Sequence, residues 1–351
     1  MKQFLSWLYR KKQPLLLGCF VTIFVIVVLL WKPGAPVSKA VMTDEFVNVS
    51  QKVIHNYVNN PQGVPLLLLF TTFRPSLSKS HIYENTLRNW AQLRPAVQPL
   101  MFYDKSLPAH WKDLLKKLGW ALLPIPKYNS FDLPILRYMF ETATDSFPAL
   151  HYGFSNGDIL FDESLILSLE ALYRHPVIED FLMVGRRINY DITANEPVYL
   201  PADVRKHSRK DSASMFIKDA QDYFITTKRA FIWDDLPNFV IGRVGYDNWL
   251  VSYAMTNGPL LIDATNTVLC LHQTGKDGDY SGSQAAKVPK YNLDLVGPGF
   301  NYNLGTTDCA QWVTAFNKKL KTVVLKKRPS KYCYGYQNIY FEHQDIDIPQ
   351  E

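Results

Sequence analysis

The sequence predicts an α/β protein built on a mostly parallel sheet with helices on both faces, preceded by one membrane-spanning helix. Short apolar runs alternate with segments of helical spacing from residue 64 onward, which is the pattern of repeated β-α units. Polar and acidic residues follow the ends of several of these runs, and an uncharged stretch lies near the N-terminus. These three observations predict the fold class and the order of its parts.

The composition is that of a globular protein with a near-neutral body. A chain of 351 residues with 47% hydrophobic and 14% aromatic residues can bury a sizeable core. It has 38 basic and 32 acidic residues, but Lys2, Arg10, Lys11 and Lys12 lie within the first 12 positions. The rest of the chain is close to neutral, which argues against a nucleic-acid-binding protein with a concentrated basic surface.

Residues 13–31 form an uncharged, mostly aliphatic stretch that predicts a transmembrane signal anchor. As a helix at ~1.5 Å per residue it spans roughly 28 Å, close to the thickness of a bilayer core. The basic cluster Arg10–Lys12 precedes it, so the positive-inside rule predicts a cytoplasmic tail at residues 1–12. A signal peptide cleaved near Ser38 and Ala40 is the alternative, but the apolar run is longer than the usual signal core.

We therefore expect a single-pass type II protein of the Golgi or ER membrane, with a stem at residues 32–61 and a lumenal domain at residues 62–351. Asn48 begins an Asn-Val-Ser sequon and is the predicted glycosylation site. Beyond the membrane run three cysteines remain, which allow at most one internal disulfide and leave one over. No pairing is predicted, because cysteine is also common as a small buried side chain. The three are Cys270, Cys309 and Cys333.

The lumenal domain begins with strands and helices in alternation. A continuous apolar run at Val64–Phe70 predicts a strand buried on both faces. The next segment has apolar residues at helical spacing, and Gly119 closes a later helix. The expected elements are a strand at 64–70, a helix at 80–94, a strand at 98–103, a helix at 110–118, a strand at 121–125, a helix at 133–143 and a strand at 150–154. Past residue 158 the alternation is less regular, which indicates one domain with a specialised second half.

Three polar segments, Thr71–Arg74, Asp104 and Asn156–Asp158, follow expected strands. Ligands of parallel sheets bind beyond the carboxyl ends of the strands, so we expect these segments to meet in one crevice. Thr71 and Arg74 offer a hydroxyl and a guanidinium for phosphate or base contacts, and Asp104 offers a carboxylate for ribose. Ordinary loop polarity is the alternative interpretation of each.

Asp158 is the first candidate metal ligand. The polar break Asn156–Asp158 between two apolar runs turns the backbone and leaves a carboxylate at the lip of the sheet. Hard divalent cations such as Mn²⁺ and Mg²⁺ take oxygen ligands and bridge diphosphates. The alternative is an Asn-Gly turn whose aspartate caps the next helix.

His272 is the second candidate metal ligand, because it lies at the border of an apolar strand and a glycine-rich loop. Mixed aspartate and histidine ligation suits Mn²⁺ better than Ca²⁺. A lone histidine is also common as a structural side chain, and that alternative stays open.

Asp247 follows two glycines and precedes apolar residues at helical spacing, which places it near a helix N-terminus. Such a carboxylate serves either as a general base for an acceptor hydroxyl or as an ordinary partner of the helix dipole.

Taken together, these segments resemble GT-A-type nucleotide-diphospho-sugar transferases, which are glycosyltransferases built on a mostly parallel sheet with flanking helices. The strand ends Thr71–Arg74 and Phe102–Asp104 resemble the nucleotide-binding half. Ser155–Phe161 is similar to the family's metal-binding acidic motif, in the variant that ends Asn-Gly-Asp. Ile241–Val251 is similar to the acceptor-side segment, and His272–Ser281 resembles the late histidine loop. The resemblance covers roughly residues 64–315.

The resemblance implies a GT-A-like, Rossmann-type fold and transfer of a sugar from a nucleotide-sugar donor to a hydroxyl of a glycan, glycoprotein or glycolipid. It implies a divalent cation, Mn²⁺ or Mg²⁺, held by Asp158 and His272, with Asp247 as the base. The donor contacts would come from Thr71, Arg74, Asp104, Asn156 and Asp158. Asn156 departs from a plain Asp-x-Asp motif, so whether it contacts metal, ribose or only water stays open.

Two other function classes remain. One is a catalytically inactive, membrane-anchored carbohydrate-binding or scaffold protein, because fold does not guarantee function. The other is a glycoside hydrolase, which needs two carboxylates flanking one bond and gives no reason for a nucleotide-binding sheet. The sequence does not decide between inversion and retention, although a base at Asp247 favours inversion.

Overall fold

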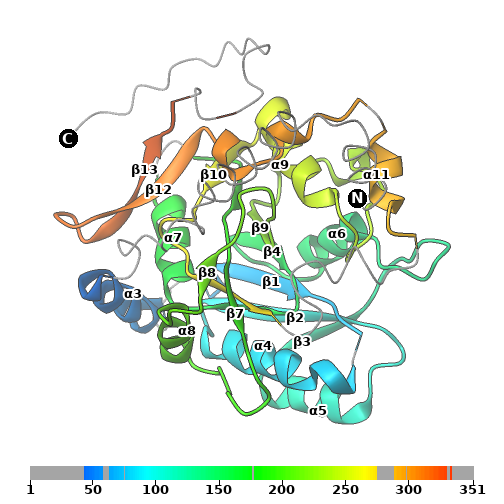
Figure 1. Cartoon of the computed structure of the whole chain (residues 1–351), viewed down its shortest axis with the longest axis horizontal. Coiled ribbons are helices and arrows are strands. Elements are labelled where there is room, and N and C mark those ends of the chain that lie inside the picture. Colours follow the sequence, from blue (N-terminus) through cyan, green and yellow to red (C-terminus); the bar gives the residue numbers. More distant parts are fainter. Residues whose placement is uncertain are drawn as a thin grey trace, which may run out of the picture. The chain divides into compact units, whose positions relative to one another are not determined.

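The computed structural model describes residues 43–57, 63–74, 76–175, 178–274, 288–297, 299–329 and 333, all within the unit Val37–Glu351 (Figure 1). The predicted tail and anchor, residues 1–31, lie outside the described residues, so they stay predictions. Among the helices that are described, none combines the length and the apolar character needed to span a bilayer.

The described chain is organised around a nine-stranded sheet in the order β13-β12-β10-β6-β9-β4-β1-β2-β3. Parallel pairs join β1 to β2 and β4, β2 to β3, and β10 to β6 and β12, while β9 runs antiparallel between β4 and β6. The mostly parallel sheet is therefore confirmed. The strands are β1 Leu67–Thr71, β2 Val97–Tyr103, β3 Ala121–Pro124, β4 His151–Ser155, β6 Phe181–Val184, β9 Tyr223–Thr226, β10 Leu260–Asp263, β12 Trp312–Asn317 and β13 Thr322–Lys327.

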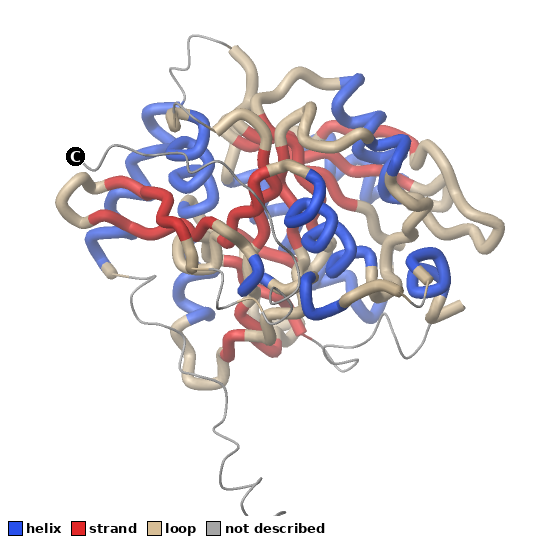
Figure 2. Tube along the Cα trace, turned by 90° about the horizontal axis from the view of Figure 1, so that it is seen from above, coloured by secondary structure: helices blue, strands red, loops and turns tan. Residues whose placement is uncertain are grey.

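Helices cover both faces of this sheet (Figure 2). Leu67 and Leu69 of β1 pack into one core cluster with α4, α5 and α7, whereas Leu68 and Phe70 pack into a second with α6 and α9. Burial on both faces explains why this strand is continuously apolar. The helices are α3 Asp44–Tyr57, α4 Ser80–Gln92, α5 Ala109–Lys117, α6 Leu136–Ser146, α7 Ser164–Tyr173, α8 Pro201–Ser208, α9 Tyr246–Asn257 and α11 Tyr291–Val296.

The seven elements expected before residue 155 all form, and the helix expected at 133–143 begins later, at Leu136. Pro134 pairs with Tyr128 and Ile135 pairs with Val240 in isolated bridges, which hold this stretch extended. Leu133 precedes a proline, and that position disfavours helical backbone. The sequence pattern located the helix but missed this delay at its start.

A second, four-stranded sheet has the order β5-β11-β7-β8. Its strands are β5 Ile159–Phe161, β7 Ile188–Asp191, β8 Ser214–Met215 and β11 Cys270–Thr274. β11 pairs antiparallel with β5 and parallel with β7. A separate core cluster that includes Leu160, Ile188 and Leu271 stabilises this sheet.

Part of the predicted stem is the helix α3. Phe46 and Val53 are buried in the core cluster that contains α7, and the ring of Phe46 lies 4.9 Å from that of Phe316. Asn48 is exposed on this helix, while the Ser50 hydroxyl is buried and donates to the carbonyl oxygen of Phe46 at 2.8 Å. The glycosylation of Asn48 stays a prediction.

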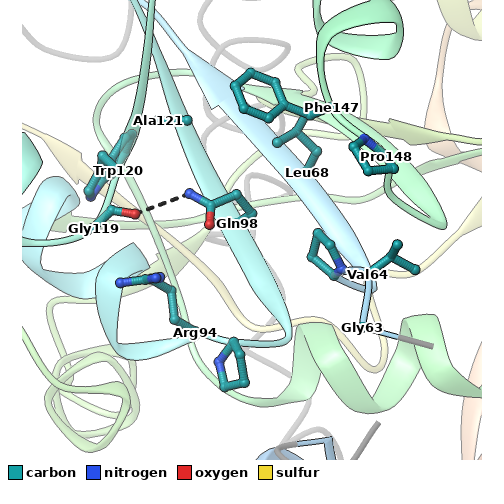
Figure 3. Close-up of a pocket in the computed structure, with 12 residues that line it drawn as sticks. Gly63, Val64, Leu68, Arg94, Gln98, Gly119, Trp120, Ala121, Phe147 and Pro148 are labelled. Carbon is teal, nitrogen blue, oxygen red and sulfur yellow. Dashed lines mark hydrogen bonds between the residues drawn. The ribbon is translucent and has the colours of Figure 1, made fainter. Parts of the chain in front are cut away.

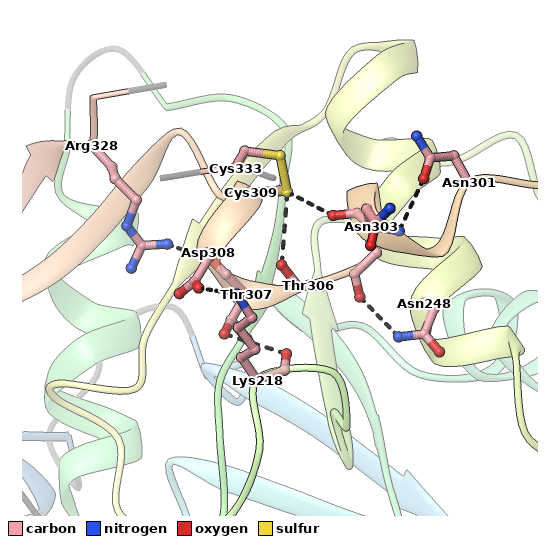
Figure 4. The surroundings of a disulfide bond; sticks show 11 residues. Lys218, Asn248, Asn301, Asn303, Thr306, Thr307, Asp308, Cys309, Arg328 and Cys333 are labelled. Atoms are coloured by element: carbon pink, nitrogen blue, oxygen red, sulfur yellow. Dashed lines mark hydrogen bonds and ion pairs between the residues drawn. A yellow bond between two sulfur atoms is a disulfide. The ribbon is translucent and has the colours of Figure 1, made fainter. Parts of the chain in front are cut away.

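A disulfide joins Cys309 to Cys333 and leaves Cys270 as a buried free thiol (Figure 4). The sequence had left this pairing open. An ion pair of 2.7 Å between Lys218 and Asp308 lies beside it. Together these contacts attach the end of the described chain to the loop before β9.

Candidate active site

Among the cavities lined by described residues, two lie at opposite ends of the sheet. The first, of about 570 Å³, lies at the N-terminal ends of β1 to β4 (Figure 3). Of the described residues that line it, only Arg94 carries a charge, and the Gln98 amide donates to the Gly119 carbonyl oxygen at 3.1 Å. The second, of about 480 Å³, lies at the carboxyl ends and is lined by several carboxylates, arginines and a histidine. The residues suited to chemistry are therefore at the second cavity.

The second cavity, hereafter the site cavity, brings together segments from seven parts of the chain. Its described lining comes from the segments after β1, β4 and β6, from α4, from the loop before β9, from the start of α9 with the turn before it, and from β11. The polar lining residues are Thr72, Arg74, Tyr83, Asn156, Asp158, Arg187, Asp219, Gln221, Asp222, Arg243, Tyr246, Asp247, Asn248 and His272. The predicted crevice at the carboxyl ends is thus present, with Arg74, Asn156, Asp158, Asp247 and His272 around it.

The small sheet positions Asp158 beside His272. In the pairing of β5 with β11, Ile159 lies opposite His272, and the backbone N–H of Gln273 donates to the carbonyl oxygen of Asp158 at 3.0 Å. The Nε2 atom of His272 lies 3.4 Å from Oδ2 of Asp158. Burial raises the pKa of Asp158, but its electrostatic interaction and hydrogen bond with His272, together with the charge of Arg187, lower it by more, so the pKa lies below the usual value. Asp158 therefore faces the cavity as a carboxylate.

A buried polar network supports this pair from beneath. Asn189 lies opposite His272 in the pairing of β7 with β11, and its Oδ1 accepts from Nδ1 of His272 at 3.1 Å and from Nε of Arg187 at 2.9 Å. Arg187 forms a buried ion pair with Asp222, and Oδ1 of Asp222 accepts from Nδ2 of Asn156 at 2.7 Å. With Nδ1 as the donor, Nε2 of His272 is directed at Asp158, which is the arrangement that metal-ligating histidines use.

Asp247 lies in the first turn of α9, as expected. Gly245, at the N-terminal boundary, has φ of 103°, a conformation that favours glycine, and its backbone N–H donates to Oδ1 of Asp247 at 3.2 Å. Burial raises the pKa of Asp247 to about 6, and the charge of Asp222 adds to the increase. A carboxylate with a pKa near neutrality is suited to accept a proton at physiological pH.

Two arginines face the site cavity from different segments. Nη2 of Arg74 donates to the carbonyl oxygen of Asp132 at 2.5 Å, which holds its side chain at the end of β1. Burial lowers the pKa of Arg243, and the positive charge of Arg74 lowers it further. Their mutual repulsion makes this side of the cavity favourable for an anion.

Two residues predicted to contact the donor, Thr71 and Asp104, do not line the site cavity in the described structure, so their donor contacts stay predictions. Thr71 is fully buried, with its hydroxyl near Gly157, and the threonine that lines the cavity is Thr72. Asp104 is not among the described residues that line the cavity. Its carboxylate accepts from the backbone N–H of Ser106 at 2.8 Å and from the Tyr128 hydroxyl at 2.8 Å, and these bonds lower its pKa to about 2. The end of a strand predicts the edge of the sheet but not the direction of each side chain.

Two side chains, those of Asp158 and His272, offer ligand atoms suited to a divalent cation. Oδ1 of Asp158 is buried without a hydrogen-bond partner in the described part of the protein, and the imidazole of His272 lies next to the same carboxylate. No cluster of three or more acidic, histidine or cysteine side chains suited to a metal occurs in the residues with described positions. Carboxylate oxygen with imidazole nitrogen suits Mn²⁺, with further ligands from outside the protein.

Comparison with known proteins gives distant structural likeness alone. No protein-family model and no curated protein sequence matches the chain. A mannosyltransferase from Pyrobaculum calidifontis, in complex with GDP-Man and Mn²⁺, is 12% identical over 67% of this chain and 66% of that one, with a TM-score of 0.38. Glucosyl-3-phosphoglycerate synthase from Mycobacterium tuberculosis, in complex with Mn²⁺, UDP and phosphoglyceric acid, is 10% identical over 80% and 90%, with a TM-score of 0.39. At this distance the description of the fold depends on the chain's own sheet order.

Sequence reasoning missed the supporting network of Arg187, Asn189 and Asp222. Arg187 and Asn189 flank the start of a four-residue strand, and Asp222 precedes another. The sequence did contain a signal for Arg187, because it follows the apolar run Phe181–Val184. Arg187 lies as far beyond the end of β6 as Arg74 lies beyond the end of β1.

Proposed function

We propose that this protein is a glycosyltransferase that moves a sugar from a nucleotide-diphosphate donor to an acceptor hydroxyl. The observation that carries the proposal is one cavity, at the carboxyl ends of the sheet, lined by both the Asp158–His272 pair and Asp247 with its raised pKa. Metal-assisted transfer from a diphosphate donor requires ligands for the metal and a general base that accepts the proton of the acceptor hydroxyl.

Each group has a distinct role in this proposal. Asp158 and His272 would hold Mn²⁺ or Mg²⁺, and the metal would stabilise negative charge on the departing nucleotide diphosphate. Arg74 and Arg243 place positive charge on the wall that faces the same diphosphate. Asp247 accepts the proton of the acceptor hydroxyl, which makes that oxygen nucleophilic, and attack by this route favours inversion at the sugar carbon.

The location is also a proposal: a type II membrane protein of the Golgi or ER with a lumenal catalytic domain. The uncharged stretch at residues 13–31 and the basic residues before it support an anchor. The disulfide between Cys309 and Cys333 supports an oxidising compartment, because disulfides persist there and are rare in the cytosol. A shift in gel mobility on glycosidase treatment, absent in Asn48→Gln, tests the lumenal location.

The experiment that tests the enzymatic proposal is a panel of nucleotide sugars, with donor hydrolysis and thermal stability measured with and without Mn²⁺. We expect one nucleotide class to stabilise the protein in the presence of Mn²⁺, and donor hydrolysis to be lost in Asp158→Ala and His272→Ala. Glu141→Gln serves as a control, because this carboxyl is partly buried and lies outside the site cavity. If no nucleotide diphosphate stabilises the protein, the enzymatic proposal is refuted.

One observation favours the carbohydrate-binding alternative. The residue two positions before Asp158 is Asn156, which supplies no second carboxylate, and its side-chain amide is already hydrogen-bonded to Asp222 and Tyr246. Glycan binding that is independent of Mn²⁺, without turnover of any donor, would favour that alternative.

A further inference from the structure

Two exposed apolar side chains, hereafter the apolar wall, line the site cavity together with Asp247. Val244 precedes Asp247 by three residues and is 43% exposed, and Ile217 is 47% exposed on the loop before β9. Both line the same cavity as Asp247. Other exposed apolar side chains, such as Ile232 and Leu320, do not line it.

The two apolar residues are held on a fixed frame. Nδ2 of Asn248 donates to the carbonyl oxygen of Asp219 at 2.8 Å and to that of Gly305 at 2.9 Å, which ties the Ile217 loop to the start of α9. The ring of Phe216, next to Ile217, lies 4.2 Å from the Arg187 guanidinium. The apolar wall is therefore attached to the same elements that position the proposed base.

The chemistry of this wall limits what lies beside the reacting hydroxyl. A sugar hydroxyl loses hydrogen bonds to water when it is placed against a hydrocarbon side chain. An alkyl or aryl group gains free energy when it covers exposed Ile and Val. The arrangement thus favours an acceptor whose apolar part lies next to the hydroxyl at Asp247.

We propose that the acceptor carries an apolar aglycone, a hydrocarbon or aryl group joined near the accepting hydroxyl, which packs against Ile217 and Val244. This inference rests on the proposed function and names the acceptor class of the same site. Ile217 and Val244 are then specificity-determining residues that distinguish apolar glycosides from free sugars and polar glycans.

The test compares methyl and octyl glycosides of the same set of monosaccharides, below the micelle concentration, as acceptors for the purified full chain. The readout is the ratio of kcat/KM for the octyl glycoside to that for the methyl glycoside. A general loss of activity cancels in this ratio. We expect a ratio of about ten or more in the native protein, and a drop of about fivefold in Ile217→Ser and in Val244→Ser. Ile232→Ser, at an isoleucine that is 66% exposed away from the cavity, keeps the native ratio.

The possible failures are distinguishable. A ratio near one in the native protein overturns the inference, as does a high ratio that Ile217→Ser and Val244→Ser leave unchanged. Donor hydrolysis without transfer to either series overturns the inference and leaves the proposed donor chemistry standing. Absence of any donor turnover refutes the proposed function, and the inference falls with it.

Discussion

Replacing Arg187 with methionine tests whether the buried network beneath the site is both structural and functional. The side chains of Arg187 and Asp222 are only 6% and 7% exposed, so the substitution leaves a buried carboxylate without its cation. Removing one partner of such a pair costs about 3–5 kcal/mol of stability, because the remaining charge keeps its desolvation cost. It also removes the Arg187 hydrogen bond to Asn189, which orients His272. Loss of such a supporting contact lowers metal affinity about 10- to 100-fold.

The assay combines urea unfolding with Mn²⁺ titration. Arg187→Met is compared with Arg174→Met, which removes an ion pair to Glu170 whose arginine is 72% exposed and which contributes at most about 1 kcal/mol. The double variant Arg187→Met with Asp222→Asn removes the stranded charge and keeps the acceptor for Asn156. We expect it to recover part of the lost stability but not the affinity for Mn²⁺.

Two results would refute this reasoning. A loss of stability in Arg187→Met no larger than in Arg174→Met would mean that the pair is not desolvated. Native Mn²⁺ affinity in the folded double variant would mean that His272 is oriented without Arg187.

Three further predictions concern other parts of the molecule. Cys333→Ser opens a loop closed over a sequence separation of 24 and is expected to lower stability by up to about 3.5 kcal/mol; a reductant should lower the Tm of the native protein but not that of the variant. Folding raises the pKa of Asp247 from 3.8 to about 6. The ionised carboxylate therefore lowers the stability of the folded protein fully above about pH 6, and this loss disappears when the pH falls below 3.8. Asp247→Asn should therefore gain stability relative to native between pH 4 and 6, by at most about 3 kcal/mol, while native kcat falls below about pH 6; a flat pH profile would contradict this. In Gly305→Ala the new Cβ would lie 2.4 Å from the backbone oxygen of Asn248. We expect this variant to lose about 1–3 kcal/mol of unfolding free energy and to turn over more slowly. Gly299→Ala is the control and is expected to be neutral, because no atom lies within 4 Å of the new Cβ.

Strands β1 to β4 of the large sheet could be predicted from the sequence because their signals are local, whereas its later strands were not located. A strand buried on both faces is a continuous apolar run, as at Leu67–Thr71, and each amphipathic helix shows its own periodicity. Of the small sheet, the sequence indicated only the apolar strand at His272, which is β11; β5 has three residues and β8 has two. Strands of this length carry too few alternations to be separated from loops.

The candidate site was predictable in part for the same reason. The sequence placed Asp158 after a strand, His272 at the end of a strand and Asp247 near a helix N-terminus; in the structure His272 lies within β11 and Asp247 in the first turn of α9, and the cavity brings all three together. Thr71 and Asp104 also end strands, but the pleat directs one side chain under Gly157 and local hydrogen bonds hold the other. Sequence position predicts the edge of the sheet, whereas the direction of each side chain depends on packing.

One strand register links these observations. β11 pairs with β5 and with β7 at once, so His272 lies opposite Ile159 on one side and Asn189 on the other. The Asp158–His272 pair and Asn189, which orients His272, are therefore set by the same register. A slip of one residue would direct His272 to the opposite face of the small sheet. The buried cluster around Leu271 opposes such a slip, because the slip would expose its apolar side chains. The chemistry of the site thus depends on the apolar packing of its smallest sheet.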